Sequence, residues 1–245
     1  MIAGVSSRAV VSPAVRRQRW RSYLLLSRVS NLPTVWTNVL AGMCASSAAV
    51  DWPTYVQTAL AVSLFYTAGM FLNDAFDEQF DRRARPERPI PSGDVSKGEV
   101  LLVGGGLLVA GELLLPMRTD ALMLGALLAL AIVAYDYHHK RSRMAPLIMG
   151  TCRGLVYGVA AAAAAGLNVG VAVGALIMAS YVAGLTVVAK AAGANARWLI
   201  PVLIAGISLV DAAFIGVVSS SIGLAAVAAL GFPLTLFLQR YVPGD

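Results

Sequence analysis

Residues 53–81 read PTYVQTALAVSLFYTAGMFLNDAFDEQFD, a long apolar run that ends in a group of carboxylates. The apolar part reaches the roughly 20 residues that a helix needs to cross a bilayer. Seven of the chain's 13 acidic residues fall between Asp74 and Glu99, starting where this run ends. Carboxylates at a membrane boundary are costly unless a cation compensates them. The stretch therefore predicts a membrane-spanning helix that ends in a cation-binding site.

The composition of the whole chain supports this interpretation. Its 245 residues are 58% hydrophobic and only 13% charged, whereas soluble domains carry about 25% charged residues. Apolar runs of about span length, with prolines in several first turns, predict an all-α fold, a polytopic membrane bundle of about eight transmembrane helices. We expect these helices over residues 32–50, 53–76, 98–116, 120–137, 146–166, 170–191, 198–217 and 221–239.

The basic residues indicate how the bundle is oriented. With the N-terminus in the cytoplasm, Arg118 is the one Lys or Arg of 19 that falls on the outer side, in agreement with the positive-inside rule. Topology and contact with anionic membrane lipid explain the net charge of +6, so nucleic acid is not an expected partner. We expect a multi-pass protein of the cell (inner) membrane, with a basic cytoplasmic segment over residues 1–22 and a transmembrane domain over residues 23–241.

Three aspartates after the second predicted span share one helix face. Because an α-helix turns about 100° per residue, Asp74, Asp77 and Asp81 fall within about 60° of arc, with Asn73 beside them. Acids at a helix C-terminus are disfavoured without a counter-ion, and Mg²⁺ prefers one or two carboxylates together with substrate phosphates and water. The face therefore favours a metal-bound phosphate over the alternative, a solvated polar cap.

The loop that follows carries arginine and proline. Arginine suits bidentate contact with phosphate, proline stiffens a loop, and Gly93 permits a turn. The residues concerned are Arg82, Arg83, Arg85, Arg88, Pro86, Pro89 and Pro91. The loop is thus suited to hold the anion that a metal would bring.

Residues 73–93 resemble the first aspartate-rich motif of the UbiA superfamily of intramembrane prenyltransferases. The shared pattern is Asn-Asp-x-x-Asp-x-x-x-Asp, followed by Arg-Pro-x-x-x-Gly. The resemblance implies that the transmembrane helices surround a central cavity. It also implies a prenyl diphosphate substrate, Mg²⁺ as cofactor, and a set of ligands for both. By resemblance these ligands are Asn73, Asp74, Asp77 and Asp81.

The family also carries a tyrosine and a lysine near the end of the fourth span, and the stretch Tyr135-Asp136-Tyr137-His138-His139-Lys140 is similar. Lys140 would neutralise a diphosphate oxygen; the alternative is a positive-inside anchor. Either Tyr135 or Tyr137 is the equivalent of the family's tyrosine. We expect His138 and His139 to be interfacial. Arg153, between glycines inside the fifth span, is expected to face a polar cavity rather than extend to the interface.

The second acidic motif that this family carries at the end of the sixth span has no counterpart here. Residues 181–195 contain no acid, and Lys190 stands where negative charge is expected. Either this lysine binds the diphosphate directly, or the site no longer ionises its substrate. A variant branch found in bacterial ebo gene clusters and linked to metabolite export is similar through the Arg-Pro-Glu-Arg-Pro-Ile-Pro-Ser-Gly loop and the Gly-Leu-Thr of the sixth span.

These observations predict an integral membrane prenyltransferase that moves a prenyl group from a prenyl diphosphate to an unidentified acceptor. The alternative is a non-catalytic or export-linked protein that retains the lipid-diphosphate pocket. The roles of the intramembrane acids Glu112 and Asp211 stay open. The expected catalytic residues are Asp74, Asp77, Asp81 and Lys140. The expected substrate-binding residues are Asn73, Arg88, Tyr135, Tyr137, Arg153 and Lys190.

Overall fold

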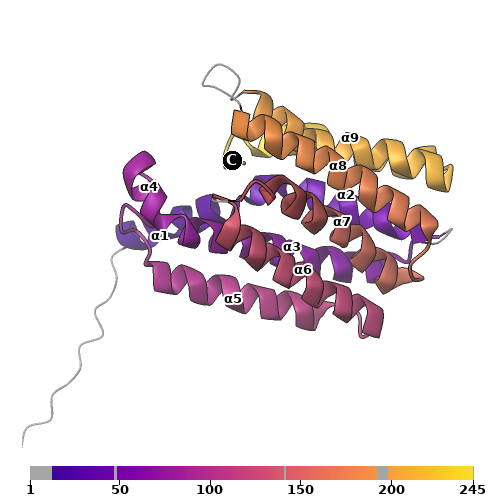
Figure 1. Cartoon of the computed structure of the whole chain (residues 1–245), viewed down its shortest axis with the longest axis horizontal. Helices are drawn as coiled ribbons and strands as arrows, with labels where there is room; N and C mark the ends of the chain where they lie inside the picture. Colours follow the sequence, from indigo (N-terminus) through magenta and orange to yellow (C-terminus); the bar gives the residue numbers. More distant parts are fainter. Residues whose placement is uncertain (1–12, 47–48, 141, 192–197, 245) are drawn as a thin grey trace, which may run out of the picture.

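The computed structural model describes residues 13–46, 49–140, 142–191 and 198–244, and in these ranges the regular elements are all helical (Figure 1). The long helices lie side by side as a bundle, and the short helix α4 projects from one end. The elements are α1 (Pro13–Ser27), η1 (Val29–Asn31), α2 (Leu32–Ser46), α3 (Trp52–Phe76), α4 (Glu78–Ala84), α5 (Lys97–Leu114), α6 (Thr119–His138), α7 (Ala145–Ala164), α8 (Val169–Ala191), α9 (Leu199–Ser219), α10 (Ile222–Ala229) and α11 (Gly231–Leu238).

The predicted all-helical membrane fold is confirmed. Each of the first seven predicted spans corresponds to one helix, from α2 to α9, with ends that differ by a few residues. Five of these helices, α3 and α6 to α9, are long and apolar enough to cross a membrane. The helix α2 is shorter than predicted because it ends at Ser46.

The eighth predicted span, residues 221–239, corresponds to the apolar helical stretch Ile222–Leu238, in which Leu230 separates α10 from α11. Pro233 lies in the first turn of α11 and has no N–H with which to continue the hydrogen-bond ladder from α10. Its nitrogen would have bonded to the carbonyl of Ala229, the last residue of α10. The chain restarts its ladder where the Leu234 N–H donates to the Leu230 carbonyl, at 3.2 Å.

The helix α2 lies at the centre of the bundle and packs against α3, α7, α8 and α9. Its contact with α7 depends on a small residue: a Cβ added at Gly42 would lie 2.7 Å from the carbonyl oxygen of Tyr157. A Cβ at Gly150 of α7 would similarly lie 2.4 Å from the carbonyl oxygen of Ala179 in α8. Small residues let membrane helices approach this closely, so these two glycines set the spacing of α2, α7 and α8.

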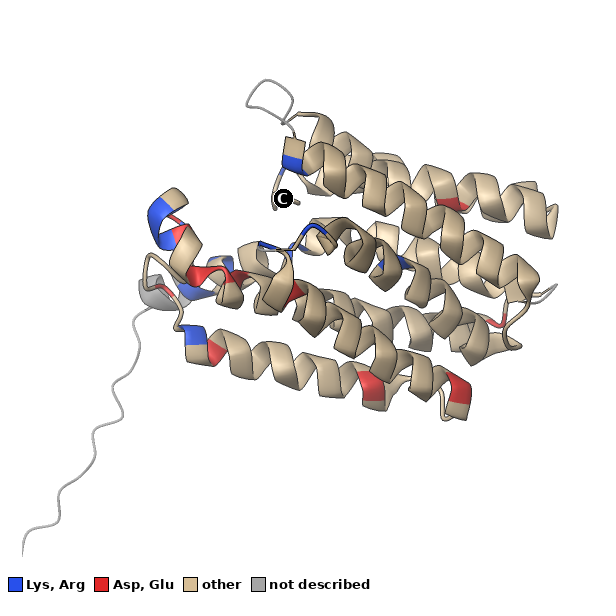
Figure 2. Ribbon diagram, in the orientation of Figure 1, with Lys and Arg blue, Asp and Glu red and all other residues tan. Residues whose placement is uncertain are grey.

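Most of the Lys and Arg positions lie at one end of the bundle, where α1 and α4 also lie (Figure 2). The loop from α4 to α5 turns back over this end. Gly93 adopts φ of 84°, a left-handed conformation that suits glycine, as expected for a turn here. Ser96 then caps α5 by accepting a hydrogen bond from the Glu99 N–H at 3.2 Å. The described part of the predicted basic segment 1–22 is the beginning of α1; residues 1–12 lie outside the described ranges.

Candidate functional site

Two of the three aspartates share one arginine of the following loop. The Arg88 guanidinium lies 3.1 Å from Oδ1 of Asp74 and 3.0 Å from Oδ2 of Asp81. Arg28, at the turn before α2, adds a second cation 2.9 Å from the same Asp74 oxygen. Both carboxylates are buried. Because buried charges need partners, these two arginines explain how α3 and α4 keep acids at this position.

The third aspartate faces a different element. Oδ2 of Asp77 lies 2.9 Å from Nζ of Lys140, and Oδ1 lies 3.3 Å from Nε2 of His139. Burial alone would raise the pKa of the Asp77 carboxyl, but hydrogen bonds and charge from His139 and Lys140 outweigh it and hold the pKa below its usual value. His139 is therefore buried in the site, and the expectation that it is an interfacial residue was wrong; His138 is exposed.

The acids do not form the single stack that the helical projection predicted. The helix α3 ends at Phe76, and Asp77 sits at its junction with α4. Asp74 and Asp81 turn toward arginine, whereas Asp77 turns toward α6. Within the described ranges, no three His, Cys, Asp or Glu side chains lie close enough together to hold a metal ion. Each carboxylate instead lies against the nearest cation, and a metal would need further oxygen ligands.

A fourth carboxylate, which was assigned no role from the sequence, lies beside the first three. Asp136 of α6 is only 3% exposed. Its Oδ1 accepts a hydrogen bond from Nδ2 of Asn73 at 3.2 Å, and its Oδ2 is buried without a hydrogen-bond partner. Asp136 lies four residues before Lys140, so both fall on one face of the α6 end. That spacing was the signal that could have identified it.

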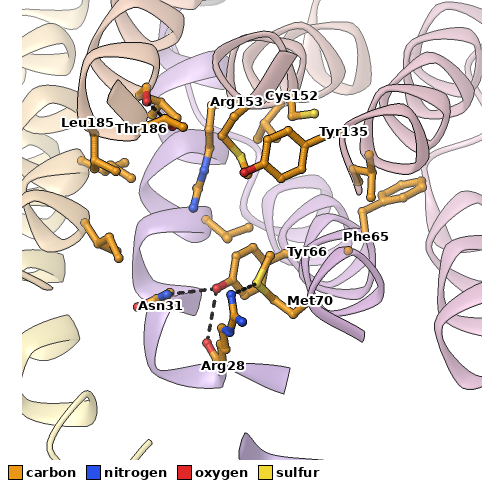
Figure 3. A pocket seen from close by; sticks show the side chains of 18 of the residues that line it. Arg28, Asn31, Phe65, Tyr66, Met70, Tyr135, Cys152, Arg153, Leu185 and Thr186 are labelled. Carbon is orange, nitrogen blue, oxygen red and sulfur yellow. Dashed lines mark hydrogen bonds between the residues drawn. The ribbon is translucent and has the colours of Figure 1, made fainter. Parts of the chain in front are cut away.

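A cavity of about 270 Å³ adjoins this polar cluster, because Arg28 and Asp136 belong to its lining; Figure 3 shows part of that lining. On α3 it is lined from Val62 to Met70, and Asn73 follows one turn later. On α6 its lining ends at Asp136, and on α8 it ends at Ala189, the residue before Lys190. Its other lining residues are mostly apolar, among them Val35, Phe65, Leu128, Ile132, Val156, Val182 and Ile204. The arrangement is an apolar chamber with a charged mouth.

The structure distinguishes the two candidate tyrosines. Tyr135 lines the cavity, and its ring points inward toward Arg153 in the close view (Figure 3). Tyr137 is 67% exposed and packs edge-on against Phe76, with ring centroids 6.0 Å apart. The substrate-binding role predicted for Tyr137 therefore lacks structural support, because its side chain lies on the surface instead of at the cavity.

Arg153 lines the cavity from α7, as expected. Its guanidinium donates to Oδ1 of Asn38 at 2.8 Å and to Oγ1 of Thr34 at 3.1 Å, and it lies over the ring of Tyr66. These partners are neutral groups of α2 and α3. The sequence had suggested a carboxylate of the cluster or the diphosphate as its partner.

A carboxylate does compensate Arg153, but through Asn38. The Nδ2 atom of Asn38 donates to both oxygens of Asp211, at 3.0 and 2.7 Å, while its Oδ1 accepts from Arg153. Asp211 also accepts from Thr37 at 2.6 Å and from Tyr157. Asp211 is fully buried, and its position in this network gives it the partners that the sequence did not reveal.

Lys190 reaches the site from the end of α8. Its Nζ donates to the backbone carbonyl of His139 at 3.3 Å, which places its charge next to the contacts of Asp77. No acid occurs in α8, and residues 192–195 of the missing motif lie outside the described ranges.

Glu112 lies at the opposite end of the bundle, near the end of α5. Its Oε2 is buried without a hydrogen-bond partner and lies near Gly125 of α6, where an added Cβ would be 2.6 Å away. The residue belongs to the packing of α5 against α6 and stands apart from the cavity, whose lining does not include it.

Comparison with known proteins agrees with this geometry. Residues 34–245 match the model of the UbiA prenyltransferase family. The chain belongs to the UbiA prenyltransferase family. It is 32% identical over 122 residues to a digeranylgeranylglyceryl phosphate synthase of Metallosphaera sedula, covering 49% of this chain and 43% of that protein. It is 30% identical over 141 residues to a 4-hydroxybenzoate octaprenyltransferase of Photobacterium profundum, covering 56% and 49%.

The chain thus spans about half the length of these curated relatives. Among solved structures, it is similar to a UbiA homologue from Archaeoglobus fulgidus bound to DMAPP and Mg²⁺, with a TM-score of 0.59 and 14% identity. That match covers 90% of this chain and 86% of the other. At this level of identity the similarity shows the fold, a multi-pass helical membrane protein.

Proposed function

We propose that this chain is an integral membrane prenyltransferase that binds a prenyl diphosphate with Mg²⁺ and transfers the prenyl group to an acceptor. The observation that carries the proposal is the position of the aspartate cluster, paired with Arg28, Arg88 and Lys140, next to an apolar cavity. A prenyl diphosphate matches this arrangement, because its diphosphate is charged and its isoprenoid tail is apolar. The relatives, which are named as prenyltransferases, support the same reaction class.

The donor set suits Mg²⁺. The candidate ligands are hard oxygens of Asn73, Asp74, Asp77 and Asp81. One of these oxygens, Oδ1 of Asp81, is buried without a partner. A bound Mg²⁺ would neutralise diphosphate oxygens and thereby stabilise the charge of the leaving group. The related structure with DMAPP and Mg²⁺ supports this metal for the family.

The cations that now pair with the aspartates are the groups that would receive the diphosphate. Arg28, Arg88 and Lys140 each contact a carboxylate of the cluster. When a metal occupies the carboxylates, these side chains are released to donate hydrogen bonds to phosphate oxygens. Charge-assisted bonds of this kind are about twice as strong as neutral ones. Lys190, next to His139, would add a fourth positive charge where an acid is absent.

The cavity has two tasks in this proposal. Its apolar lining would hold the isoprenoid tail and exclude water from the allylic carbon as the C–O bond to diphosphate breaks. Tyr66 and Tyr135 both line the cavity, and their rings suit a developing carbocation by cation–π attraction. The acceptor is unidentified; hydroxybenzoate and glycerol phosphate derivatives are the compounds to try first, on the strength of the relatives' names.

We place the protein in the cell (inner) membrane with the N-terminus and the charged end of the bundle in the cytoplasm. The support is the collection of basic side chains at that end (Figure 2) and the positive-inside rule. A cysteine-accessibility experiment on intact cells tests this orientation. A cysteine introduced into the α4–α5 loop should resist an impermeant thiol reagent, and a cysteine in place of Met117 should react with it.

The direct test uses the purified chain in lipid nanodiscs with Mg²⁺ and geranylgeranyl diphosphate. Diphosphate release that requires one member of an acceptor panel, together with a prenylated product, supports the proposal. Comparison of lipid extracts from cells with and without the protein would then identify the natural product. Failure to bind the prenyl diphosphate at any Mg²⁺ concentration overturns the proposal.

One observation favours a second function. The acid of the family's second motif is absent from α8, where Lys190 stands instead. A protein that holds a lipid diphosphate without ionising it, in a role linked to metabolite export, would tolerate this change. Tight Mg²⁺-dependent binding without turnover of any acceptor supports this alternative over the enzyme.

A further inference from the structure

Among the buried acids at this end of the bundle, Asp136 makes no ion pair with a cation of the described residues. The other three, Asp74, Asp77 and Asp81, each lie within 3.3 Å of a cationic nitrogen. Asp136 has a neutral partner, the amide of Asn73, and its second oxygen is buried without any hydrogen bond among the described residues. A buried carboxylate in this state is costly unless it binds a proton or a cation.

We propose that Asp136 of α6, together with Asn73 of α3, binds a second divalent cation against the diphosphate and so replaces the acid that α8 lacks. This inference rests on the proposed function, because the diphosphate supplies the remaining ligands. Asp136 then joins Asp74, Asp77 and Asp81 as a fourth acidic residue of the site.

The hydrogen bond between the two residues orients both for this task. The side-chain amide nitrogen of Asn73 donates a hydrogen bond to Oδ1 of Asp136. This bond fixes the direction of the amide and leaves its carbonyl oxygen for another partner. The buried Oδ2 of Asp136, which has no hydrogen-bond partner among the described residues, supplies a carboxylate oxygen when a cation displaces the proton. Carbonyl and carboxylate oxygens are the ligands that hard divalent cations prefer. A partner that holds a ligand in one orientation is a common feature of metal sites.

Asp136 also has access to a bound diphosphate. It lines the cavity together with Tyr135 and Arg28, at the level where the apolar lining gives way to charged residues. Two protein ligands are few for a metal site, and no three acidic or histidine side chains converge among the described residues. Mg²⁺ accepts such a site when phosphate oxygens and water complete its coordination. Binding of this second cation should therefore require the diphosphate.

The residues at the end of α8 also favour Asp136 as the acid that would bind a second cation. Lys190 donates a hydrogen bond to the backbone carbonyl of His139. The Nδ1 atom of His139 in turn lies 3.1 Å from the backbone carbonyl oxygen of Asp136. The end of α8 thus carries a positive charge that attracts phosphate, and it supplies no acid as a metal ligand. The carboxylate for a second cation must come from another helix, and Asp136 is the acid in place.

The experiment counts Mn²⁺ bound to the full chain in nanodiscs by electron paramagnetic resonance. The probe is geranylgeranyl thiolodiphosphate, whose bridging sulfur slows ionisation. We expect two Mn²⁺ per bound probe for wild type and one for Asp136→Asn, with probe affinity reduced about tenfold. Glu112→Gln is the matched control: it removes another carboxyl with a buried oxygen that has no hydrogen-bond partner among the described residues, at the far end, and should keep two Mn²⁺.

Two Mn²⁺ per probe in Asp136→Asn, or one in wild type, overturns the inference and leaves the proposed function intact. No probe binding by wild type at any Mn²⁺ concentration overturns both. If Asp136→Asn does not fold, Fe²⁺ with ascorbate and the probe is applied to wild type, because bound iron cleaves the backbone beside its ligands. Cleavage near residue 136 supports the second site, and cleavage confined to residues 74–81 overturns it.

Discussion

The ammonium nitrogen of Lys140 lies 2.9 Å from a carboxylate oxygen of Asp77, and this contact joins the end of α6 to the end of α3. Both residues follow a membrane-spanning helix on the same side of the bundle. The ring of His139 meets the other oxygen of the same carboxylate. Asp77 is therefore the acid through which the proposed metal ligands at the end of α3 and the proposed phosphate-binding cations at the end of α6 would influence one another.

Replacing Asp77 by Asn should abolish most of the Mg²⁺-dependent affinity for a prenyl diphosphate. The change removes a metal ligand and leaves Lys140 and His139 without their anion. We expect a loss of about 100-fold or more, since a hydrogen bond to a charged group is worth about 1.5–3 kcal/mol and a metal contact is lost as well. Calorimetric titration with geranylgeranyl thiolodiphosphate in nanodiscs measures it.

Glu78→Gln is the control for this variant. Glu78 is the next residue, and it pairs at the surface with Arg82, at 2.7 Å, and Lys97, at 3.5 Å. It should bind the probe as wild type does. Wild-type affinity in Asp77→Asn would instead show that the aspartates are only a polar cap on α3.

The Asp77 contacts should also make stability depend on pH. Because His139 and Lys140 lower the folded-state pKa of this carboxyl, its contribution is fully present above the unfolded value of about 3.9 and is lost as the pH falls through the lowered folded value. Asp77→Asn should therefore melt below wild type at pH 7. The difference should shrink as the pH falls below about 4. A constant difference from pH 7 to pH 3 would contradict this assignment.

Much of the fold was predictable because a bilayer leaves few choices. Apolar length, helix-start prolines and the placement of Lys and Arg predicted seven helices to within a few residues at most ends. The irregularity at Leu230 within the eighth span was not predicted, since Pro233 reads equally well as a residue inside a span or in the first turn of a new helix. The hydrophobic pattern of one sequence predicts where helices lie along the chain. It does not predict which helices pack against one another.

The site was predictable where its residues are adjacent in sequence. The cluster from Asp74 to Asp81 and the return of Arg88 follow from one loop. The contacts of Arg28, Asp136 and Asp211 join helices that are distant in the chain, and no spacing rule connects them. An intramembrane acid did signal a partner, but only packing shows that Asp211 finds Asn38.

Lys190→Gln should weaken diphosphate binding about five- to tenfold without changing the number of bound Mn²⁺. The lysine lies beside His139 and is expected to contact phosphate instead of a metal; removing one exposed charge contact costs about 1 kcal/mol. Lys97→Gln serves as the control, because Lys97 pairs with Glu78 outside the cavity. Loss of one Mn²⁺ in Lys190→Gln would show that α8 shapes the metal site itself.

Gly42→Ala should destabilise the bundle by about 1–3 kcal/mol, because overpacking at a tight contact forces backbones apart. The added methyl would lie 2.7 Å from the Tyr157 carbonyl, which belongs to the helix backbone of α7 and has little freedom to move. Gly105→Ala is the matched change: a Cβ there meets nothing within 4 Å. Unfolding in mixed micelles should separate the two variants, and equal stability would contradict the close α2–α7 contact.

Arg153 and Asp211 should be energetically coupled although Asn38 separates them. Arg153→Met or Asp211→Asn alone leaves one charge in a buried network without its opposite, which is strongly destabilising. The double variant removes both charges, so its loss should be smaller than the sum of the single losses by about 0.5–3 kcal/mol. Free energies of unfolding in mixed micelles, measured for the four proteins of the cycle, give this coupling.

The same cycle with Glu112→Gln in place of Asp211→Asn supplies the comparison, because Glu112 lies between α5 and α6 and does not line the cavity. That pair should be additive within about 0.3–0.5 kcal/mol, as distant sites are. If the cycle with Asp211 is additive to the same extent, Asn38 does not transmit charge between the two residues. Arg153 would then have only neutral partners. Its guanidinium would be a stronger candidate for binding an anionic substrate.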